Sequence, residues 1–304
     1  MIKPPRLKKG SLIRIVSPAG KIEEKHVLPA VQWLEKQGYR VKTGKHIFSR
    51  HFQFAGTDNE RLGDLQEAFD DPKCDAIICS RGGYGTVRII DQLNFTNFLE
   101  YPKWLVGFSD ITALHCCLNN YGVPSIHGVM PRFFLDETAH ATESLQTLTN
   151  ILSGENVIYQ LPYSDFNRTG KANAEMVGGN LSLITSLIGT YYELDTDGKI
   201  LFLEDVNEYL YQADRMMHQL KLSGKLDKLA ALIVGDFTDM KDNNSPFGEN
   251  VYEIISEAVS DYNYPVCYNF PAGHDKKNLA LLFGKPWEID VTKHETTLKL
   301  QCQI

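Results

Sequence analysis

A serine in the first half of the chain has the surroundings of a catalytic nucleophile. Ser109 lies between the apolar run 104–106, which predicts a buried strand, and a helical pattern that begins near Ile111. A serine in such a turn directs its hydroxyl to a helix N-terminus, where free N–H groups favour negative charge. The same position suits a helix N-cap, and Ile111 replaces the last glycine of a Gly-x-Ser-x-Gly pattern. The local sequence leaves both roles open.

Two residues in the second half could complete a serine triad. Glu204 follows the apolar run 200–203, so its carboxylate lies at a buried strand end and needs a partner. His274 ends a turn that follows another apolar run. Each residue alone could be an ordinary structural polar group. Together with Ser109 they have the order Ser, Glu, His, which is the order of nucleophile, acid and base in α/β-hydrolases.

A glycine-rich loop could supply backbone N–H groups to the same chemistry. Residues 80–85 follow an apolar run and include Gly82, Gly83 and Gly85. Such a loop can form an oxyanion hole, a phosphate cradle or simply a tight turn. Its spacing matches neither the dinucleotide-binding nor the Walker pattern, so a nucleotide site is not expected.

Other titratable residues are weaker candidates. His115 is one turn into the helix after the serine and is expected to pack there, whereas His127 is a candidate for lining the site. Asp205, Glu208 and Asp214 suit solvated or capping positions better than catalytic ones.

The elements that must position these residues follow from the hydrophobic pattern. The first 130 residues alternate short apolar runs with helical patterns, which predicts βαβ units around a parallel sheet, with ligands outside the carboxyl ends of its strands. We expect strands at 12–16, 39–41, 76–79 and 104–108. We expect helices at 25–36, 86–93 and 111–118, and a further helix that begins after an N-cap at Asp58.

The pattern predicts two domains. Domain 1–140 would be a parallel-sheet α/β domain with Ser109, residues 141–173 a linker, and domain 174–304 a smaller α/β domain with a mixed sheet that holds Glu204 and His274. In the second domain we expect helices at 181–188, 209–222 and 251–259, strands at 200–203, 230–234 and 266–270, and an antiparallel pair at 287–291 and 297–300.

Composition excludes several classes of protein. The 304 residues are 43% hydrophobic and 23% charged, with a net charge of -7 that argues against a nucleic-acid binder. The basic run 3–9 precedes only a short apolar stretch that Arg14 interrupts, so neither a secretory signal nor a membrane span is expected. The cysteines form no Cys-x-x-Cys pairs and lie mostly in apolar runs, which favours buried free thiols in the cytoplasm.

Taken together, the motifs resemble the LD-carboxypeptidase family, serine peptidases with a Ser-Glu-His triad that include the microcin-immunity carboxypeptidases. The resemblance runs from about residue 10 to residue 285. It rests on segments in the family's order, which are 17–20, 56–58 with Arg61, 80–85, 106–110, 178–181, 202–205 and 273–274.

The resemblance implies that Ser109 attacks the scissile carbonyl, His274 takes its proton and Glu204 orients His274. It implies an oxyanion hole made by the backbone N–H groups of Asp110 and Gly83. The implied substrate is a cytoplasmic muropeptide that loses a terminal D-alanine, and the implied assembly is a homodimer. No metal, cofactor, nucleic acid or membrane is expected.

The substrate-binding residues expected from the glycine-rich loop 80–85 are Arg81, Gly82 and Tyr84. An exopeptidase must neutralise a free carboxylate, and Arg81 could do so or could tie down the glycine loop. Two other functions stay open. One is an immunity-type enzyme that cleaves a peptidyl or aminoacyl nucleotide antibiotic, and the other is a non-catalytic two-domain ligand-binding module, against which the three triad candidates argue.

Overall fold

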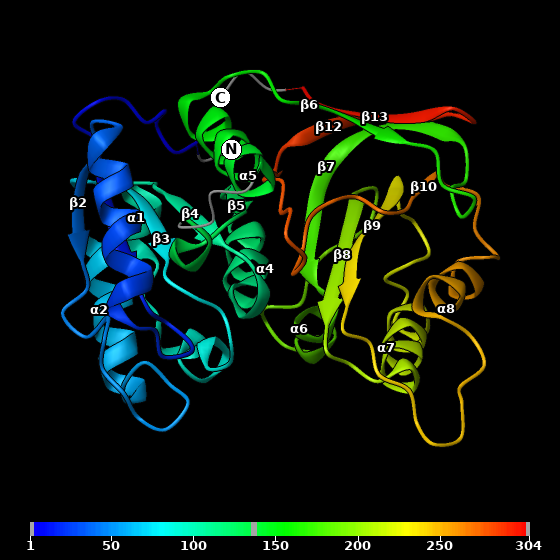
Figure 1. The fold of residues 1–304 in the computed structure, drawn as a ribbon, viewed down its shortest axis with the longest axis horizontal. Coiled ribbons are helices and arrows are strands. Elements are labelled where there is room, and N and C mark those ends of the chain that lie inside the picture. Colours follow the sequence, from blue (N-terminus) through cyan, green and yellow to red (C-terminus); the bar gives the residue numbers. More distant parts are fainter. Residues whose placement is uncertain (1–2, 135–138, 302–304) are drawn as a thin grey trace.

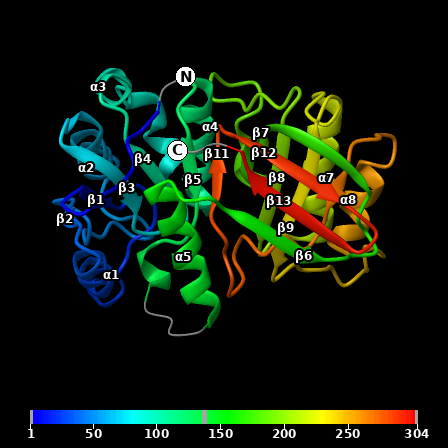
Figure 2. The same ribbon diagram turned by 90° about the horizontal axis from the view of Figure 1, so that it is seen from above.

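Two β-sheets organise the chain, one in each half, and each carries helices on its faces (Figure 1). The computed structural model describes residues 3–134 and 139–301. The first-half elements and the second-half elements form two lobes that lie side by side in both views (Figure 2).

The first sheet has six strands in the order β11-β5-β4-β3-β1-β2. All neighbours pair in parallel except β11, which comes from the second half and pairs antiparallel with β5. The predicted parallel α/β sheet is therefore confirmed. Its strands are β1 (Leu12–Val16), β2 (Arg40–Thr43), β3 (Cys74–Cys79), β4 (Trp104–Gly107), β5 (Ser125–His127) and β11 (Leu281–Phe283).

Helices cover both faces of this sheet, so that its central strands β3 and β4 are buried on both sides. Residues Ile13 and Ile15 pack with α1 and α5, while Val16 packs in a second cluster with α2, α3 and α4. The α-helices are α1 (Glu24–Lys36), α2 (Asp58–Asp70), α3 (Thr96–Glu100), α4 (Thr112–Asn120) and α5 (Ala139–Ser153), and the 3-10 turns are η1 (Thr86–Arg88), η2 (Ile90–Gln92), η3 (Ser109–Ile111) and η4 (Pro131–Phe133).

The second sheet is mixed, as the sequence predicts. Its order is β10-β9-β8-β7-β12-β13-β6, in which β7 to β10 are parallel and the other three strands pair antiparallel. Its elements are β6 (Ile158–Pro162), β7 (Gly170–Asn180), β8 (Ile200–Val206), β9 (Ala231–Thr238), β10 (Val266–Cys267), β12 (Pro286–Val291) and β13 (Glu295–Leu300), with helices α6 (Leu181–Ser186), α7 (Leu210–Leu222) and α8 (Val251–Ala258).

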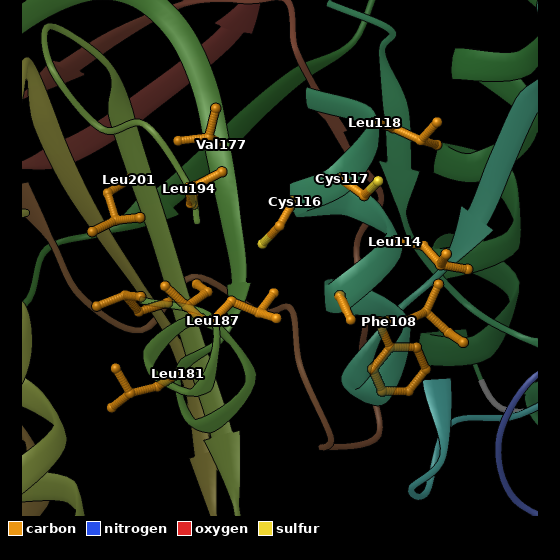
Figure 3. Close-up of a cluster of buried hydrophobic side chains, with 14 of the residues drawn as sticks. Phe108, Leu114, Cys116, Cys117, Leu118, Val177, Leu181, Leu187, Leu194 and Leu201 are labelled. Carbon is orange, nitrogen blue, oxygen red and sulfur yellow. The ribbon is translucent and has the colours of Figure 1, made fainter. Parts of the chain in front are cut away.

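The two halves share their hydrophobic core. Helix α4 packs against β7 and α6, and Figure 3 shows its Cys116 facing the side of Val177 and Leu194. Burial raises the pKa of the Cys116 thiol to about 12, so this sulfur behaves as a small apolar group. The cysteines in the described ranges are all buried free thiols, as expected, and Cys302 lies outside these ranges.

Some expected elements differ from those observed. The pattern at 86–93 predicts a helix, but the segment forms the two 3-10 turns η1 and η2, and its first N–H, on Thr86, donates to the Asp110 carboxylate and ties the segment to the serine turn. The cap of α2 is Thr57 rather than Asp58, since Thr57 forms a capping box with Glu60. The strand expected at 266–270 is limited to β10.

Residues 141–173, expected to be a linker, carry regular structure. They contain most of α5, whose Leu148 and Ile151 are buried against the first sheet, and all of β6. The helix is hidden in the sequence because many of its residues are hydroxyl-bearing and have low helix propensity. In the fold, Ser144, Thr147 and Thr149 bond back to carbonyls of their own helix. The division into domains 1–140 and 174–304 stays a prediction.

Candidate active site

Ser109 occupies a sharp turn between β4 and α4. Its φ is 64°, a left-handed conformation that is costly for a residue with a side chain and that is often found at functional sites. The turn is tight at Gly107, where an added β-carbon would come within 2.9 Å of Ile111 side-chain carbons. The strand, turn and helix expected around Ser109 are therefore present, and they leave this side chain partly exposed while Asp110 is buried.

His274 and Glu204 form a hydrogen-bonded pair. Nδ1 of His274 lies 2.7 Å from Oε2 of Glu204, whose side chain is fully buried at the end of β8, while the His274 side chain is 18% exposed. Burial lowers the pKa of His274, but the carboxylates of Glu204, Asp205 and Asp236, with Glu204 the largest of them, together outweigh burial, and the net pKa is raised above its usual value. Gly273 allows the close approach, since a β-carbon there would lie 3.2 Å from Glu204 Oε2.

Ser109 and His274 line one cavity of about 390 Å³, which we call the serine cavity. Phe108 packs against the His274 ring at a centroid distance of 5.0 Å. Glu204 lies behind the histidine, on the far side of the hydrogen bond. The fold thus brings together three residues that the sequence separates by 95 and 70 positions.

The glycine loop faces Ser109 across a small space. A β-carbon on Gly82 would lie 2.9 Å from Ser109 Oγ and 3.4 Å from the backbone nitrogen of Asp110. Only a residue without a side chain leaves that space open for another atom. Gly83 has φ +107° and also lines the serine cavity. The space has the position that an oxyanion would need beside Ser109.

Arg61 holds the loops around the glycines in place. Its side chain is buried, and its Nη1 donates to the carbonyl oxygens of Pro18 at 2.5 Å and of Gly85 at 2.8 Å. Its Nη2 pairs with Asp58. The loop 17–20 also bonds directly to the glycine loop, because the Gly20 N–H donates to the Gly82 carbonyl at 3.0 Å. These contacts give structural roles to the motifs at 17–20 and 56–61.

Two further carboxylates surround the histidine and glutamate pair. Asp205 is buried and accepts hydrogen bonds from Asn180 Nδ2 and from the Ser182 N–H in the first turn of α6, so the expected capping role applies and a solvated one does not. Burial, followed by the charge of Glu204, raises the pKa of Asp205 to about 7. Burial and the neighbouring Asp275 and Glu204 likewise raise the pKa of Asp236 to about 7.

The two other histidines considered as site candidates, His115 and His127, are buried structural residues. His115 bonds to Ser125 Oγ at 2.8 Å and to the Gly107 carbonyl at 2.9 Å, and burial lowers its pKa to about 4. The expected packing role of His115 is confirmed. His127 bonds to Asn278 at 3.2 Å and lies against Phe108 rather than on the wall of the serine cavity.

Some residues of the cavity were not expected from the sequence. Arg81, Gly82 and Gly83 line it as expected, whereas Tyr84 is absent from its wall and is 48% exposed. Unexpected lining residues come from two loops, with Met130, Arg132 and Phe133 after β5 and Val206 and Asn207 at the end of β8. Asn207 directly follows a strand, which is a signal that could have identified it, while Arg132 has no such signal.

Within residues 3–134 and 139–301, no group of three or more histidine, cysteine, aspartate or glutamate side chains could hold a metal ion. In the same ranges no helix has the length and apolar character needed to cross a bilayer.

Comparison with known proteins assigns the chain to a family. A probable murein peptide carboxypeptidase of Bacillus subtilis is 36% identical over 287 residues, which cover 93% of this chain and 89% of that protein. The crystal structure of muramoyltetrapeptide carboxypeptidase from Oxalobacter formigenes superposes with a TM-score of 0.86 at 29% identity, covering 95% of this chain and 98% of that one. The microcin C7 self-immunity protein of Escherichia coli is 25% identical, covering 90% of this chain and 88% of that protein.

The models of the LD-carboxypeptidase N-terminal and C-terminal domains match residues 13–128 and 173–289, which together contain Ser109, Glu204 and His274. The resemblance noted in the sequence is thereby confirmed over most of the chain. This chain belongs to the LD-carboxypeptidase family, a family of peptidases.

Proposed function

We propose that this chain is a serine carboxypeptidase that releases the terminal D-alanine from L,D-bonded muropeptide tetrapeptides during cell-wall recycling. One observation carries the proposal. Ser109, held in a left-handed turn, lines the same cavity as His274, and Nδ1 of His274 is hydrogen-bonded to the buried Glu204. The names of the Bacillus subtilis and Oxalobacter formigenes relatives support the muropeptide as substrate.

The proposed reaction begins at His274. Its Nδ1 bonds the Glu204 carboxylate, and because an ionised carboxylate only accepts hydrogen bonds, Nδ1 carries the proton and Nε2 is left as the base. Nε2 would take the proton of Ser109 as Oγ attacks the scissile carbonyl carbon, and would then pass it to the departing amine of D-alanine. A water molecule would then attack the acyl-enzyme, with Nε2 taking a proton from the water and returning it to Ser109 Oγ as the acyl product leaves.

The oxyanion of the tetrahedral intermediate would lie in the space that Gly82 leaves open. The Asp110 N–H borders this space, and the Gly83 N–H is the second proposed donor. A donor of this kind contributes about 3 to 4 kcal/mol to transition-state stabilisation. The Phe108 ring packed on His274 limits the water that reaches the imidazole.

We also propose a cytoplasmic homodimer that uses no cofactor and binds neither nucleic acid nor membrane. The net charge of -7 supports the absence of a nucleic-acid partner. Sedimentation equilibrium at several protein concentrations would measure the assembly state, and a monomer at every concentration would contradict the dimer.

The test of the function is stereochemical. With the terminal carboxylate and the carbonyl oxygen both held, the methyl group of the last residue has one allowed direction, so a tetrapeptide ending in L-alanine should react at least about a hundredfold more slowly. The measurement is kcat/KM for the two diastereomers by mass-spectrometric product analysis, with Ser109→Ala as the inactive control and with chelator present. Turnover of an aminoacyl nucleotide but of neither peptide would favour the immunity-type enzyme instead.

The same assay tests the serine mechanism. Ser109→Ala should lower kcat by several orders of magnitude, and the wild-type rate should survive a chelator, because the triad generates its own nucleophile. Full activity in the alanine variant would exclude Ser109 as nucleophile. Binding of the peptides without turnover would point to the ligand-binding module.

A further inference from the structure

A second cavity shares two arginines with the serine cavity. It has a volume of about 420 Å³ and is lined by Lys21, Glu23, His26, Arg50, Arg81 and Arg132. We call it the basic cavity. Arg81 and Arg132 belong to the walls of both cavities. A ligand that extends from one cavity into the other would therefore pass Arg81 and Arg132.

The charges around the basic cavity are not balanced by its own residues. Glu23 is the one acid among the lining residues described, and it pairs with Lys25 at 2.6 Å. Burial and then the charge of Arg132 lower the pKa of Arg81. The cations therefore repel one another, and an anionic ligand would relieve that repulsion.

The position of a substrate carboxylate limits which cation can bind it. In a substrate of an exopeptidase, the free carboxylate is one residue, roughly 3.5 Å of chain, beyond the scissile carbonyl. Its partner must therefore face the serine cavity, and among the described residues the cations that do so, besides His274, are Arg81 and Arg132. Lys21 and Arg50 line the basic cavity but not the serine cavity.

The two arginines differ in what already holds them. Nη1 of Arg81 donates to the Lys21 carbonyl at 2.9 Å, which ties this side chain to the loop that meets the glycine loop. Within the described part of the chain, the Arg132 side chain makes neither a hydrogen bond nor an ion pair. Its planar fork is open to a bidentate contact with a carboxylate.

We propose that Arg132 binds the free α-carboxylate of the residue to be released, and that Arg81 chiefly holds the glycine loop. Arg132 is then the residue that makes this enzyme an exopeptidase. The inference rests on the proposed carboxypeptidase function and adds to it the group that recognises the chain end. It also explains why a cation is present in the loop after β5, away from the motifs at the strand ends.

The experiment compares an L,D tetrapeptide that ends in a free carboxylate with its C-terminal carboxamide. Wild-type enzyme should prefer the free acid. Arg132→Gln should lower kcat/KM for the acid by about 10- to 100-fold, the range expected for a hydrogen bond to a charged group, and should leave the amide rate within about twofold. Arg132→Lys should recover part of the loss. Arg215→Gln, a surface arginine that lies over Tyr211, is the matched control.

Several results would overturn the proposal. An equal fall for acid and amide would assign Arg132 a merely structural role. A larger selective loss in Arg50→Gln than in Arg132→Gln would place the anion deeper in the basic cavity, and a selective loss only in Arg81→Gln would restore Arg81 as the carboxylate partner. Thermal unfolding of each variant checks that folding is intact.

A binding measurement tests this inference separately from the proposed function. In Ser109→Ala, calorimetric affinity for the free-acid peptide should exceed that for the amide, and adding Arg132→Gln should abolish the difference. If wild-type enzyme cleaves neither peptide, the proposed function fails, while the affinity difference still decides the role of Arg132. Equal affinities for acid and amide in Ser109→Ala would reject the inference even if the enzyme cleaves the peptide.

Discussion

Ser109 and His274 depend on different kinds of local support. The left-handed turn at Ser109 costs about 1 to 3 kcal/mol and persists because β4, α4 and the tight contact at Gly107 determine its backbone. His274 depends on electrostatics instead, since its ring is held by a buried carboxylate. Activity and stability should therefore respond to pH through the histidine rather than through the serine.

The acidic limb of the pH profile is expected above the usual pKa of 6.5 for histidine. The base must be neutral, and burial, which lowers the pKa of His274, is outweighed by the nearby carboxylates together, chiefly Glu204, which raise it. Glu204→Gln should move the limb of kcat/KM to lower pH, besides lowering the rate. An acidic limb that stays in place in the glutamine variant would show that another group controls it.

Stability should change with pH in the opposite sense. Because the pKa of His274 is higher in the folded than in the unfolded chain, the pair with Glu204 stabilises the fold fully below about pH 6.5. This contribution is lost as pH rises through the folded pKa. The pKa values of Asp205 and Asp236, raised to about 7, act in the same direction. Urea unfolding from pH 5 to 9 would measure the loss, and a stability that rises over this range would contradict it.

At the scale of elements, strand ends could be predicted and loop trajectories could not. Ser109 and Glu204 follow continuous apolar runs, which are typical of buried strands, so their location was readable from the sequence. Helix α5 was missed because its many hydroxyl-bearing residues have low helix propensity. In the fold these hydroxyl groups bond to carbonyls of their own helix. Arg132 was missed because it lies in the short 3-10 turn η4 of the connection after β5, whose course only the packed fold determines.

The glycine pair at the end of β7 sets the register that places Glu204. Gly178 has φ +142°, and a β-carbon there would lie 2.0 Å from the Phe202 carbonyl oxygen of β8. In the parallel pairing of β7 with β8, Asn180 lies opposite Glu204. Gly178→Ala combines a conformation nearly restricted to glycine with a backbone clash, so we expect a loss of about 2 to 6 kcal/mol in the free energy of unfolding.

A second glycine provides the control for this prediction. Gly63 is exposed in helix α2, and a β-carbon there would meet no atom within 4 Å. Gly63→Ala should stabilise the protein by about 0.5 to 1 kcal/mol, because alanine loses less conformational entropy in a helix. Urea unfolding measures both variants. Similar stabilities for the two would show that the backbone clash at β7 is relieved elsewhere.

At the scale of the whole molecule, neither half contains a complete site. Ser109 and the glycine loop come from the first sheet, while Glu204 and His274 come from the second half. The halves also exchange structure, because β11 is sequence from the second half and completes the edge of the first sheet beside β5. The core clusters likewise continue from one half into the other.

Separated halves should therefore be inactive and poorly soluble. Fragment 1–140 would expose the edge of β5 and the face of α4 that packs on β7 and α6, and exposed strand edges and apolar faces promote aggregation. Light scattering and the tetrapeptide assay on each purified fragment would test this. Turnover by fragment 1–140 alone would show that Glu204 and His274 are dispensable.

The basic cavity has a consequence for how fast substrate arrives. The molecule as a whole carries a charge of -7, yet the basic cavity, which shares Arg81 and Arg132 with the serine cavity, is also lined by Lys21 and Arg50. A local field of this kind attracts an anionic peptide into productive encounters, and dissolved ions weaken it within about 10 Å at 0.1 M salt. Raising the salt concentration should lower kcat/KM for the free-acid peptide while kcat stays constant. Arg50→Gln should weaken that dependence, so that the rate of substrate capture falls less between dilute and concentrated salt.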